Sequence, residues 1–226
     1  MGFSSEWEET YKNNAHLSVW PWSNLVSLTH RYCDLHKGMK VLELGCGAGA
    51  NVPYFISLGA DYYGLEGSKT MVSKLSGQFP KESCHFACVD FTKDFHYKDV
   101  LNGGGYDIII DRGSVTHNAT ADIQNVIKLS LDYLKPGGKY IGMDWFATDN
   151  EFFRSGQYKC KEVDGNTRVF QDGYFAGLGN VHFSDAGHIK ELFSGFKLEF
   201  LEEKVHRQEF PEPVTWAWWD FVFSKK

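Results

Sequence analysis

The fold of this 226-residue chain is decided by residues 41–51, which read VLELGCGAGAN. The first four residues are typical of a buried strand, and glycine then occupies the alternate positions Gly45, Gly47 and Gly49. Glycine permits a sharp turn and leaves backbone N–H groups open to a ligand. The stretch therefore predicts a parallel strand that ends in a ligand-binding glycine turn and is followed by a helix.

Two classes of cofactor fit this turn. Gly45-x-Gly47-x-x-Ala50 is an allowed variant of the dinucleotide-binding fingerprint. The alternative spacing, Glu43-x-Gly45-x-Gly47-x-Gly49, places a carboxylate inside the strand, two positions before the first glycine. Burying an unpaired carboxylate is costly, so this side chain needs a partner. The cationic amino end of S-adenosylmethionine would be such a partner.

Later landmarks separate the two cofactors. A second predicted strand, 61–66, ends in Glu66, 21 positions after Gly45, where a carboxylate can accept hydrogen bonds from the ribose hydroxyls of either cofactor. The third predicted strand is followed directly by Asp90 and Phe91. A fifth strand is entered through residues 134–142, which read LKPGGKYIG.

These four landmarks, in this order, resemble the class I S-adenosylmethionine-dependent methyltransferases, and residues 41–51 resemble their motif I. The resemblance implies a Rossmann-like α/β fold with a seven-stranded, mostly parallel sheet and helices on both faces. It also implies that Asp90 receives the adenine amino group and that Phe91 packs against the ring. The donor-binding residues carried over from the family are Glu43, Gly45, Cys46, Gly47, Gly49, Glu66, Gly67, Asp90, Phe91 and Asp111.

Alternating strand and helix patterns indicate one domain over residues 1–226, because such alternation gives a parallel sheet wrapped by helices. We divide it into a helical cap (1–38), a cofactor-binding core (39–146), an insert or lid (147–184) and a C-terminal helix with a strand pair (185–226). The expected strands are 39–44, 61–66, 84–89, 106–111, 138–145, 196–206 and 214–224; Pro21 is expected to open a second cap helix, and Ser184 to cap a helix over 185–194.

Composition favours a small-molecule enzyme over a nucleic-acid binder. The formal net charge is −6, and no basic stripe is visible in the sequence. Five cysteines are scattered without ligand spacing, which predicts free thiols in a reducing compartment and no metal site. No run approaches the length of a membrane span and no signal segment is apparent, so a cytoplasmic protein without membrane or nucleic-acid partners is expected.

Candidate catalytic residues follow the fourth and fifth strands. A methyl transfer aligns a nucleophile with an already activated carbon, and a hydroxyl acceptor also needs a base. His117 and Asp144 are the leading candidates, with His182 and His188 as further histidines, of which His188 is expected on the surface. The Asp111-Arg112-Gly113 segment after the fourth strand is loosely similar to the thiopurine methyltransferase group. A plainer interpretation of Asp111 and Arg112 is an ion pair that fixes the loop.

Aromatic residues make up 16 % of the chain. Those in the cap and insert are candidates to wall an acceptor pocket, since aromatic side chains commonly line such sites. Trp216, Trp218 and Trp219, in the last strand, are expected in the core.

Three other functions stay open at this point. A nicotinamide-dependent oxidoreductase shares the glycine turn but leaves Asp90-Phe91 and the Pro-Gly-Gly segment unexplained. A protein or RNA methyltransferase keeps the donor site and changes the acceptor. A catalytically silent subunit would keep the fold without needing the donor residues. The favoured prediction is transfer of a methyl group from S-adenosylmethionine to an oxygen, nitrogen or sulfur atom of a small molecule.

Overall fold

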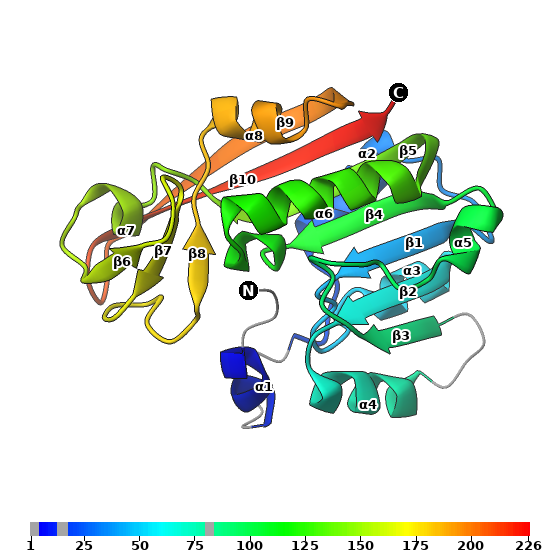
Figure 1. Cartoon of the computed structure of the whole chain (residues 1–226), viewed down its shortest axis with the longest axis horizontal. Helices are drawn as coiled ribbons and strands as arrows, with labels where there is room; N and C mark the ends of the chain where they lie inside the picture. Colours follow the sequence, from blue (N-terminus) through cyan, green and yellow to red (C-terminus); the bar gives the residue numbers. More distant parts are fainter. Residues whose placement is uncertain (1–4, 13–17, 80–83) are drawn as a thin grey trace.

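A seven-stranded sheet forms the centre of the molecule in the computed structural model, which describes residues 5–12, 18–79 and 84–226 (Figure 1). The strand order is β3-β2-β1-β4-β5-β10-β9. The first five are parallel to one another, and β10 runs antiparallel to both β5 and β9. Their bounds are β1 Lys40–Leu44, β2 Asp61–Glu66, β3 Cys84–Cys88, β4 Tyr106–Arg112, β5 Leu134–Phe146, β9 Phe196–Gln208 and β10 Val214–Lys225. The predicted Rossmann-like architecture is confirmed.

Helices cover both faces of this sheet. On one face α2 (Ser23–Tyr32), α3 (Val52–Ser57) and α4 (Lys69–Gln78) bury Leu25, Phe55 and Leu75 against the strands. On the other face α6 (Thr120–Tyr133) and α8 (Ala186–Leu192) bury Ile123 and Ile189. The central strands are therefore apolar on both faces, as the run Ile108-Ile109-Ile110 of β4 shows. The remaining short helix of this part, α5, spans Asp99–Asn102.

The start of β5 differs from the prediction. It begins at Leu134 rather than at residue 138, so the Pro-Gly-Gly segment lies inside the strand. Tyr106 of β4 pairs with Leu134, whereas Ile108 pairs with Lys139, so the extra residues of β5 bulge out between these pairs. A Cβ atom at Gly138 would lie 2.9 Å from the carbonyl oxygen of Lys135, which explains glycine there.

Two predicted helix starts are also displaced. The second cap helix, α2, begins at Ser23, two residues after Pro21. The helix α8 is capped by Asp185 rather than Ser184, because the Asp185 carboxylate accepts a hydrogen bond of 2.7 Å from the backbone N–H of His188. The first cap helix, α1, spans Ser5–Lys12; residues 1–4 and 13–17 of the predicted cap lie outside the described residues.

The insert is a small folded unit rather than an irregular loop. After α7 (Glu151–Arg154), three antiparallel strands follow in the order β6-β7-β8: Cys160–Glu162, Thr167–Phe170 and Asn180–His182. They lie at the left of Figure 1, beyond the ends of β5 and β10. The insert has its own aromatic core, made of Phe152, Phe170, Phe175, Val181 and Phe183. This packing makes the insert a compact unit beside the main sheet.

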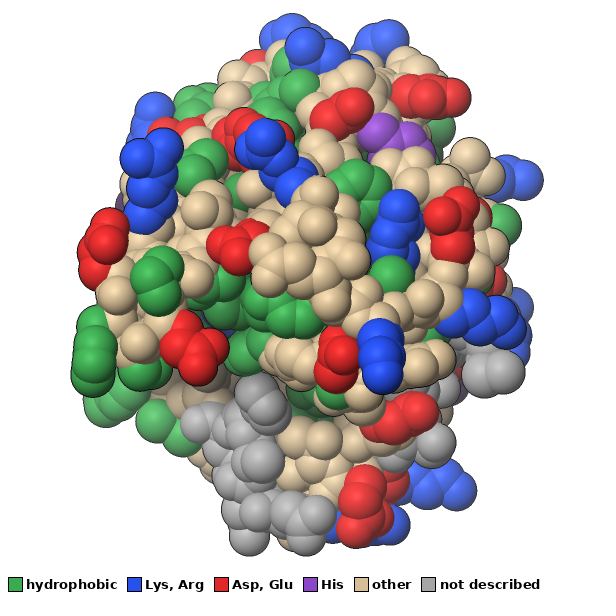
Figure 2. Space-filling model, turned by 90° about the vertical axis from the view of Figure 1, so that its left-hand side faces the viewer, with side chains coloured by type: hydrophobic (Ala, Val, Ile, Leu, Met, Phe, Trp, Pro, Cys, Tyr) green, Lys and Arg blue, Asp and Glu red, His purple; other side chains and the backbone are tan. Residues whose placement is uncertain are grey.

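Figure 2 shows the face of the molecule that carries the insert, on which acidic and basic side chains are interspersed. In this view Lys and Arg do not gather into a stripe among the described side chains. Within residues 5–12, 18–79 and 84–226, no helix is long and apolar enough to cross a membrane.

Candidate active site

One cavity of about 630 Å³ opens at the carboxyl ends of β1, β2, β4 and β5. This edge is where open α/β sheets bind their ligands. We call one part of its lining the glycine-turn wall: Gly45, Gly47, Glu66, Asp90 and Phe91. We call a second part of the lining the network wall: Trp22, Arg112, Asp144, Lys204, Trp216 and Trp218.

The glycine turn brings bare backbone to the cavity. Gly45 and Gly47 have positive φ values of 68° and 51°, which residues with a Cβ atom rarely adopt. A Cβ atom on Gly45 would lie 2.4 Å from the Cβ of Ser114, and one on Gly47 would lie 3.2 Å from the Tyr11 hydroxyl. The N–H groups of Gly45 and Cys46 donate to Leu65, so the turn offers a close approach rather than the free donors that the sequence suggested.

Glu66, at the end of β2, is a buried acceptor on this wall. Its side chain is 3 % exposed, and its two carboxylate oxygens accept the backbone N–H groups of Gly47 and Ser68, each at 2.9 Å. Burial raises the pKa of Glu66, although these N–H groups oppose the shift. The backbone N–H of Gly67 also interacts with this carboxylate, so three of its about four acceptor positions are used and one is left for a ligand. Gly67, the next residue, also lines the cavity.

Glu43 is satisfied by the protein itself, which corrects the argument that it needs a cationic ligand. The hydroxyl of Tyr62 donates to Oε2 at 2.5 Å, and the side-chain amide of Asn51 donates to Oε1 at 2.9 Å. Burial raises the pKa of Glu43 to about 7, against the effect of these two donors. Glu43 lines the cavity and braces the start of the helix that follows the turn.

Asp90 both lines the cavity and caps a turn. Its Oδ1 accepts hydrogen bonds from the backbone and hydroxyl of Thr92, and its Oδ2 lies 3.0 Å from the Lys93 ammonium. Burial alone would raise the pKa of Asp90, but these contacts outweigh it and lower the pKa. Phe91 is 9 % exposed and packs into the core while one part of it lines the cavity.

Of the predicted donor residues, Gly49 and Asp111 do not line the cavity, whereas Cys46 does. A Cβ on Gly49 would lie 2.5 Å from Cδ2 of Leu75, so this glycine serves helix packing. Asp111 is fully buried and accepts hydrogen bonds from the backbone N–H groups of Ser114 and Val115 and from the Trp145 indole. It therefore shapes the loop beneath the cavity.

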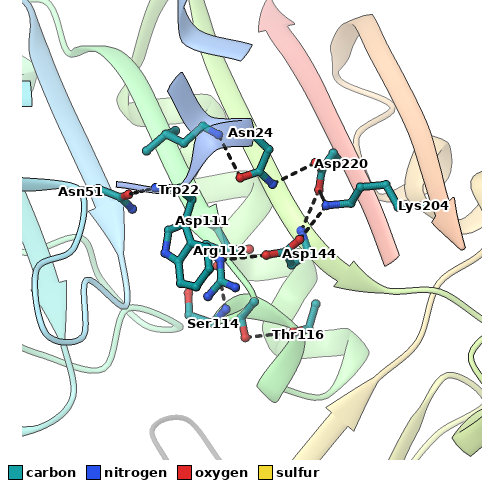
Figure 3. A network of polar contacts seen from close by, with 12 residues as sticks. Trp22, Asn24, Asn51, Asp111, Arg112, Ser114, Thr116, Asp144, Lys204 and Asp220 are labelled. Carbon is teal, nitrogen blue, oxygen red and sulfur yellow. Dashed lines mark hydrogen bonds and ion pairs between the residues drawn. The ribbon is translucent and has the colours of Figure 1, made fainter. Parts of the chain in front are cut away.

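An ionic network lies at the network wall and comprises Arg112, Asp144, Lys204 and Asp220 (Figure 3). Asp144 receives the Arg112 Nε at 2.8 Å on one oxygen and the Lys204 ammonium at 2.7 Å on the other. Lys204 also lies 2.8 Å from Asp220. The expected pair of Arg112 with Asp111 is wrong, because Asp111 is occupied by the loop. Both oxygens of Asp144 face cations, so a positioning role fits it better than proton transfer.

His117 ends the short 3-10 helix η1 (Val115–His117) and lines the cavity between the two walls. Its Nδ1 lies 3.0 Å from the carbonyl oxygen of Asn180, and its ring contacts Trp7 and Phe146 edge-on. Burial lowers the pKa of His117 to about 4. The backbone of Leu178 also interacts with the ring. Because a carbonyl only accepts, the tautomer that donates from Nδ1 to Asn180 has its lone pair on Nε2.

The comparisons with known proteins agree with this geometry. Residues 42–140 match the family described as "Methyltransferase domain", a span that contains the glycine turn and every residue of the glycine-turn wall. Residues 42–140 are therefore a methyltransferase domain, set in the fold of the class I S-adenosylmethionine-dependent methyltransferases.

Relatives of this methyltransferase are distant. It is 26 % identical over 155 residues to phosphoethanolamine N-methyltransferase 1 of Arabidopsis thaliana; the match covers 64 % of this chain and 30 % of that longer protein. A solved S-adenosylmethionine-dependent methyltransferase from Methanosarcina mazei superposes with a TM-score of 0.67 at 13 % identity, covering 91 % of this chain and 98 % of the other. The 1,6-didemethyltoxoflavin-N1-methyltransferase of Burkholderia thailandensis, solved with substrate and S-adenosylhomocysteine, gives 0.63 at 12 % identity, with coverage of 98 % and 84 %.

The other two candidate histidines of the methyltransferase lie away from the cavity. His182 of β8 and His188 of α8 face each other with their Nε2 atoms 3.2 Å apart, and the Thr167 hydroxyl lies 2.9 Å from Nδ1 of His182. His188 is half-buried in this pair rather than on the open surface. Burial lowers the pKa of His182 to about 3 and lowers that of His188 as well. Across the described part of the chain, no cluster of three His, Cys, Asp or Glu side chains is placed to hold a metal ion.

Two tryptophans of β10 were expected in the core but line the cavity. The rings of Trp216 and Trp218 stack in parallel with centroids 5.8 Å apart, whereas Trp219 is 9 % exposed on the opposite face. Side chains two positions apart share one face of a strand, so the spacing of these tryptophans was the signal that the sequence analysis missed. Lys204, by contrast, is one of several charged residues in β9 and gave no signal.

Proposed function

We propose that this methyltransferase transfers the methyl group of S-adenosylmethionine to an oxygen, nitrogen or sulfur atom of a small-molecule acceptor. The observation that carries the proposal is that a single cavity joins the glycine-turn wall to the network wall. Its volume of about 630 Å³ lies within the range of pockets that enclose small ligands. Donor and acceptor bound at the two walls would meet inside it.

The glycine-turn wall fits the adenosyl end of the donor. The remaining acceptor position of Glu66 suits a ribose hydroxyl, and the remaining acceptor capacity of Asp90 suits the adenine amino group beside the ring of Phe91. The bare turn at Gly45 and Gly47 lets the ligand approach the backbone closely.

S-adenosylmethionine supplies a methyl group that its sulfonium already activates. The protein therefore has to align the acceptor atom, exclude water and, for a hydroxyl acceptor, remove a proton. The neutral His117, held through Nδ1, can accept that proton on Nε2. The aromatic rings of Trp7 and Phe146 flank it and keep bulk water from that part of the cavity.

A small acceptor is favoured over RNA or protein by the charge of the chain and by the enclosed aromatic lining. The net charge of −6 opposes binding to a phosphate backbone. The Arabidopsis relative acts on phosphoethanolamine by its name, which makes small amines worthwhile members of an acceptor screen.

All five cysteines are free thiols, and we infer a cytoplasmic location from them.

Calorimetric titration tests the donor, and release of S-adenosylhomocysteine tests the acceptor. We expect micromolar binding of S-adenosylmethionine and S-adenosylhomocysteine and none of the nicotinamide dinucleotides. In a panel of small hydroxyl, amine and thiol compounds set beside peptides and RNA, release should occur with a small compound. Turnover with only RNA or peptide would overturn the small-molecule proposal while leaving the donor intact.

A further inference from the structure

The two carboxylates of the ionic network have most of their hydrogen-bonding capacity in use. Each oxygen of Asp144 faces one cation. In Asp220, Oδ1 receives both the Lys204 ammonium and the backbone N–H of Asp144, and Oδ2 receives the side-chain amide of Asn24 (Figure 3). Asp220 is also 3 % exposed and does not line the cavity. Asp220 therefore offers little to an incoming ligand, and the charges of both carboxylates are already paired with the two cations.

The two cations, in contrast, retain donors. An ammonium has three N–H groups, and Lys204 directs two of them at Asp144 and Asp220. A guanidinium has five, and Arg112 faces Asp144 through Nε; among the described residues its two terminal nitrogens have no hydrogen-bond acceptor. Both side chains line the cavity and are about a quarter to a third exposed, at 22 % and 32 %. The N–H groups of Arg112 and Lys204 that the network does not use are therefore available as donors at the cavity surface.

The Arg112 guanidinium is held in a fixed plane. It stacks on the Trp22 ring with its central carbon 3.3 Å from the ring centroid. Stacking leaves the edge of the guanidinium free, and that edge matches two oxygens of one carboxylate or phosphate. The parallel rings of Trp216 and Trp218 line the same wall and provide an apolar surface for the body of a ligand.

We propose that the methyl acceptor carries an anionic oxygen group, a carboxylate or a phosphate, bound by the N–H donors of Arg112 and Lys204. This proposal rests on the proposed function and adds the chemical class of the acceptor. A cationic acceptor would be repelled by Arg112 and Lys204, because the carboxylates of Asp144 and Asp220 are already paired with these two cations. A neutral acceptor without such oxygens would leave the same donors unpaired, which costs binding energy.

The test titrates four matched probes into the wild-type protein, with and without S-adenosylhomocysteine: benzoate, phenyl phosphate, benzamide and benzylamine. We expect benzoate or phenyl phosphate to bind at least about tenfold more tightly than benzamide, since a hydrogen bond to a charged group contributes about that factor. The tighter of the two anions identifies carboxylate or phosphate as the preferred group. Affinities of both anions no higher than that of benzamide, or tightest binding of benzylamine, would overturn the proposal.

Two variants locate the effect. Lys204→Met should abolish the preference for the anion, whereas Lys197→Met should keep it, because Lys197 lies on the same strand β9, is 65 % exposed and pairs with Glu199. An unchanged preference in Lys204→Met would contradict the proposal. The wild-type comparison decides the matter even if Lys204→Met does not fold. Failure of S-adenosylhomocysteine to bind would count against the proposed function, whereas the probe preference without it still tests the anion site.

Discussion

The two walls of the cavity are built in different ways. On the glycine-turn wall, the hydrogen bonds of Glu66 and Asp90 reach Gly47, Ser68 and Thr92, none of them more than 19 positions away. On the network wall, Lys204 bonds Asp144, 60 positions away, and Asn24 bonds Asp220, 196 positions away. The first wall is a local consequence of strand and turn. The second exists only once α2, β4, β5, β9 and β10 have assembled.

This difference separates the constraints on the two walls. The glycine-turn wall depends on backbone geometry, since side chains at Gly45 and Gly47 would collide with Ser114 and Tyr11. The network wall depends on side chains carried by strands whose backbone hydrogen bonds do not involve them. Substitutions on the network wall can therefore alter the acceptor without disturbing the donor site, provided that the ionic network remains paired.

The largest expected effect is on donor affinity. Glu66→Ala removes a buried carboxylate that we assign to the ribose, and a hydrogen bond to a charged acceptor contributes about 1.5–3 kcal/mol, which is a loss of roughly 10- to 100-fold. Glu66→Gln is the matched control and should retain part of the affinity. Calorimetric titration with S-adenosylhomocysteine measures both. Unchanged affinity in Glu66→Ala would remove this residue from the donor site.

Removing a carboxylate from the ionic network should instead lower the free energy of unfolding. Asp220→Ala leaves Lys204 and the backbone N–H of Asp144 short of a buried partner, and breaking a buried ion pair costs about 3 kcal/mol. Asp90→Ala, on the other wall, removes contacts with only Thr92 and Lys93 and should cost about 1 kcal/mol. Urea unfolding measures the free energy of unfolding of both variants and so compares the two losses. Equal losses would show that the ionic network is not a structural unit.

Acid should destabilise the fold through two buried histidines, one lining the cavity and one in the insert. His117 and His182 have pKa values lowered to about 4 and about 3, so between about pH 6.5 and pH 4 the unfolded chain binds more protons than the folded one. The contribution of these two histidines is therefore fully present above pH 6.5 and is lost as the pH decreases, whereas Glu43, whose pKa is raised to about 7, contributes with the opposite sign. Thermal unfolding from pH 7.5 to 4.5 measures the slope, which His182→Asn should flatten and the exposed control His36→Asn should not. An identical slope in His182→Asn would refute this source of pH dependence.

The smallest effects concern helix caps on either side of the molecule. Asp185 caps α8 through the N–H of His188, and Ser68 caps α4 through the N–H of Met71 at 3.2 Å. Replacing either cap by Ala should cost about 1 kcal/mol. Ser68→Ala should additionally weaken donor binding, because the backbone N–H of Ser68 donates to the Glu66 carboxylate and the cap helps to position it, whereas Asp185→Ala should leave donor binding unchanged. Loss of donor affinity in Asp185→Ala would argue that the two regions are coupled.

The sequence predicts the glycine-turn wall well because strand, turn and acidic residue are read from neighbouring positions. The strand alternation likewise predicts the sheet, and the sheet is confirmed. The start of β5 at Leu134 was not predicted, because a bulge depends on the partner strand rather than on the local sequence. The folded insert escaped because its aromatic core, around Phe152 and Phe175, packs residues that show no simple period.

The network wall was only partly predictable. Asp144 was identified from its place after a strand, but its cationic partners Arg112 and Lys204 were not, because no local pattern links β4, β5 and β9. The wrong expectation for Trp216 and Trp218 has a related cause. Aromatic residues in a late strand are usually core, and which face of β10 meets a cavity depends on the insert and α2 beside it.

A crystal structure of the protein with S-adenosylhomocysteine would test most directly the claim that donor and acceptor bind at different walls of one cavity. The account predicts a ribose hydroxyl on the carboxylate of Glu66, the adenine beside Asp90 and Phe91, and the sulfur facing His117, with the network wall still open. An adenosine moiety seated between Trp22 and Trp218, on the network wall, would contradict it.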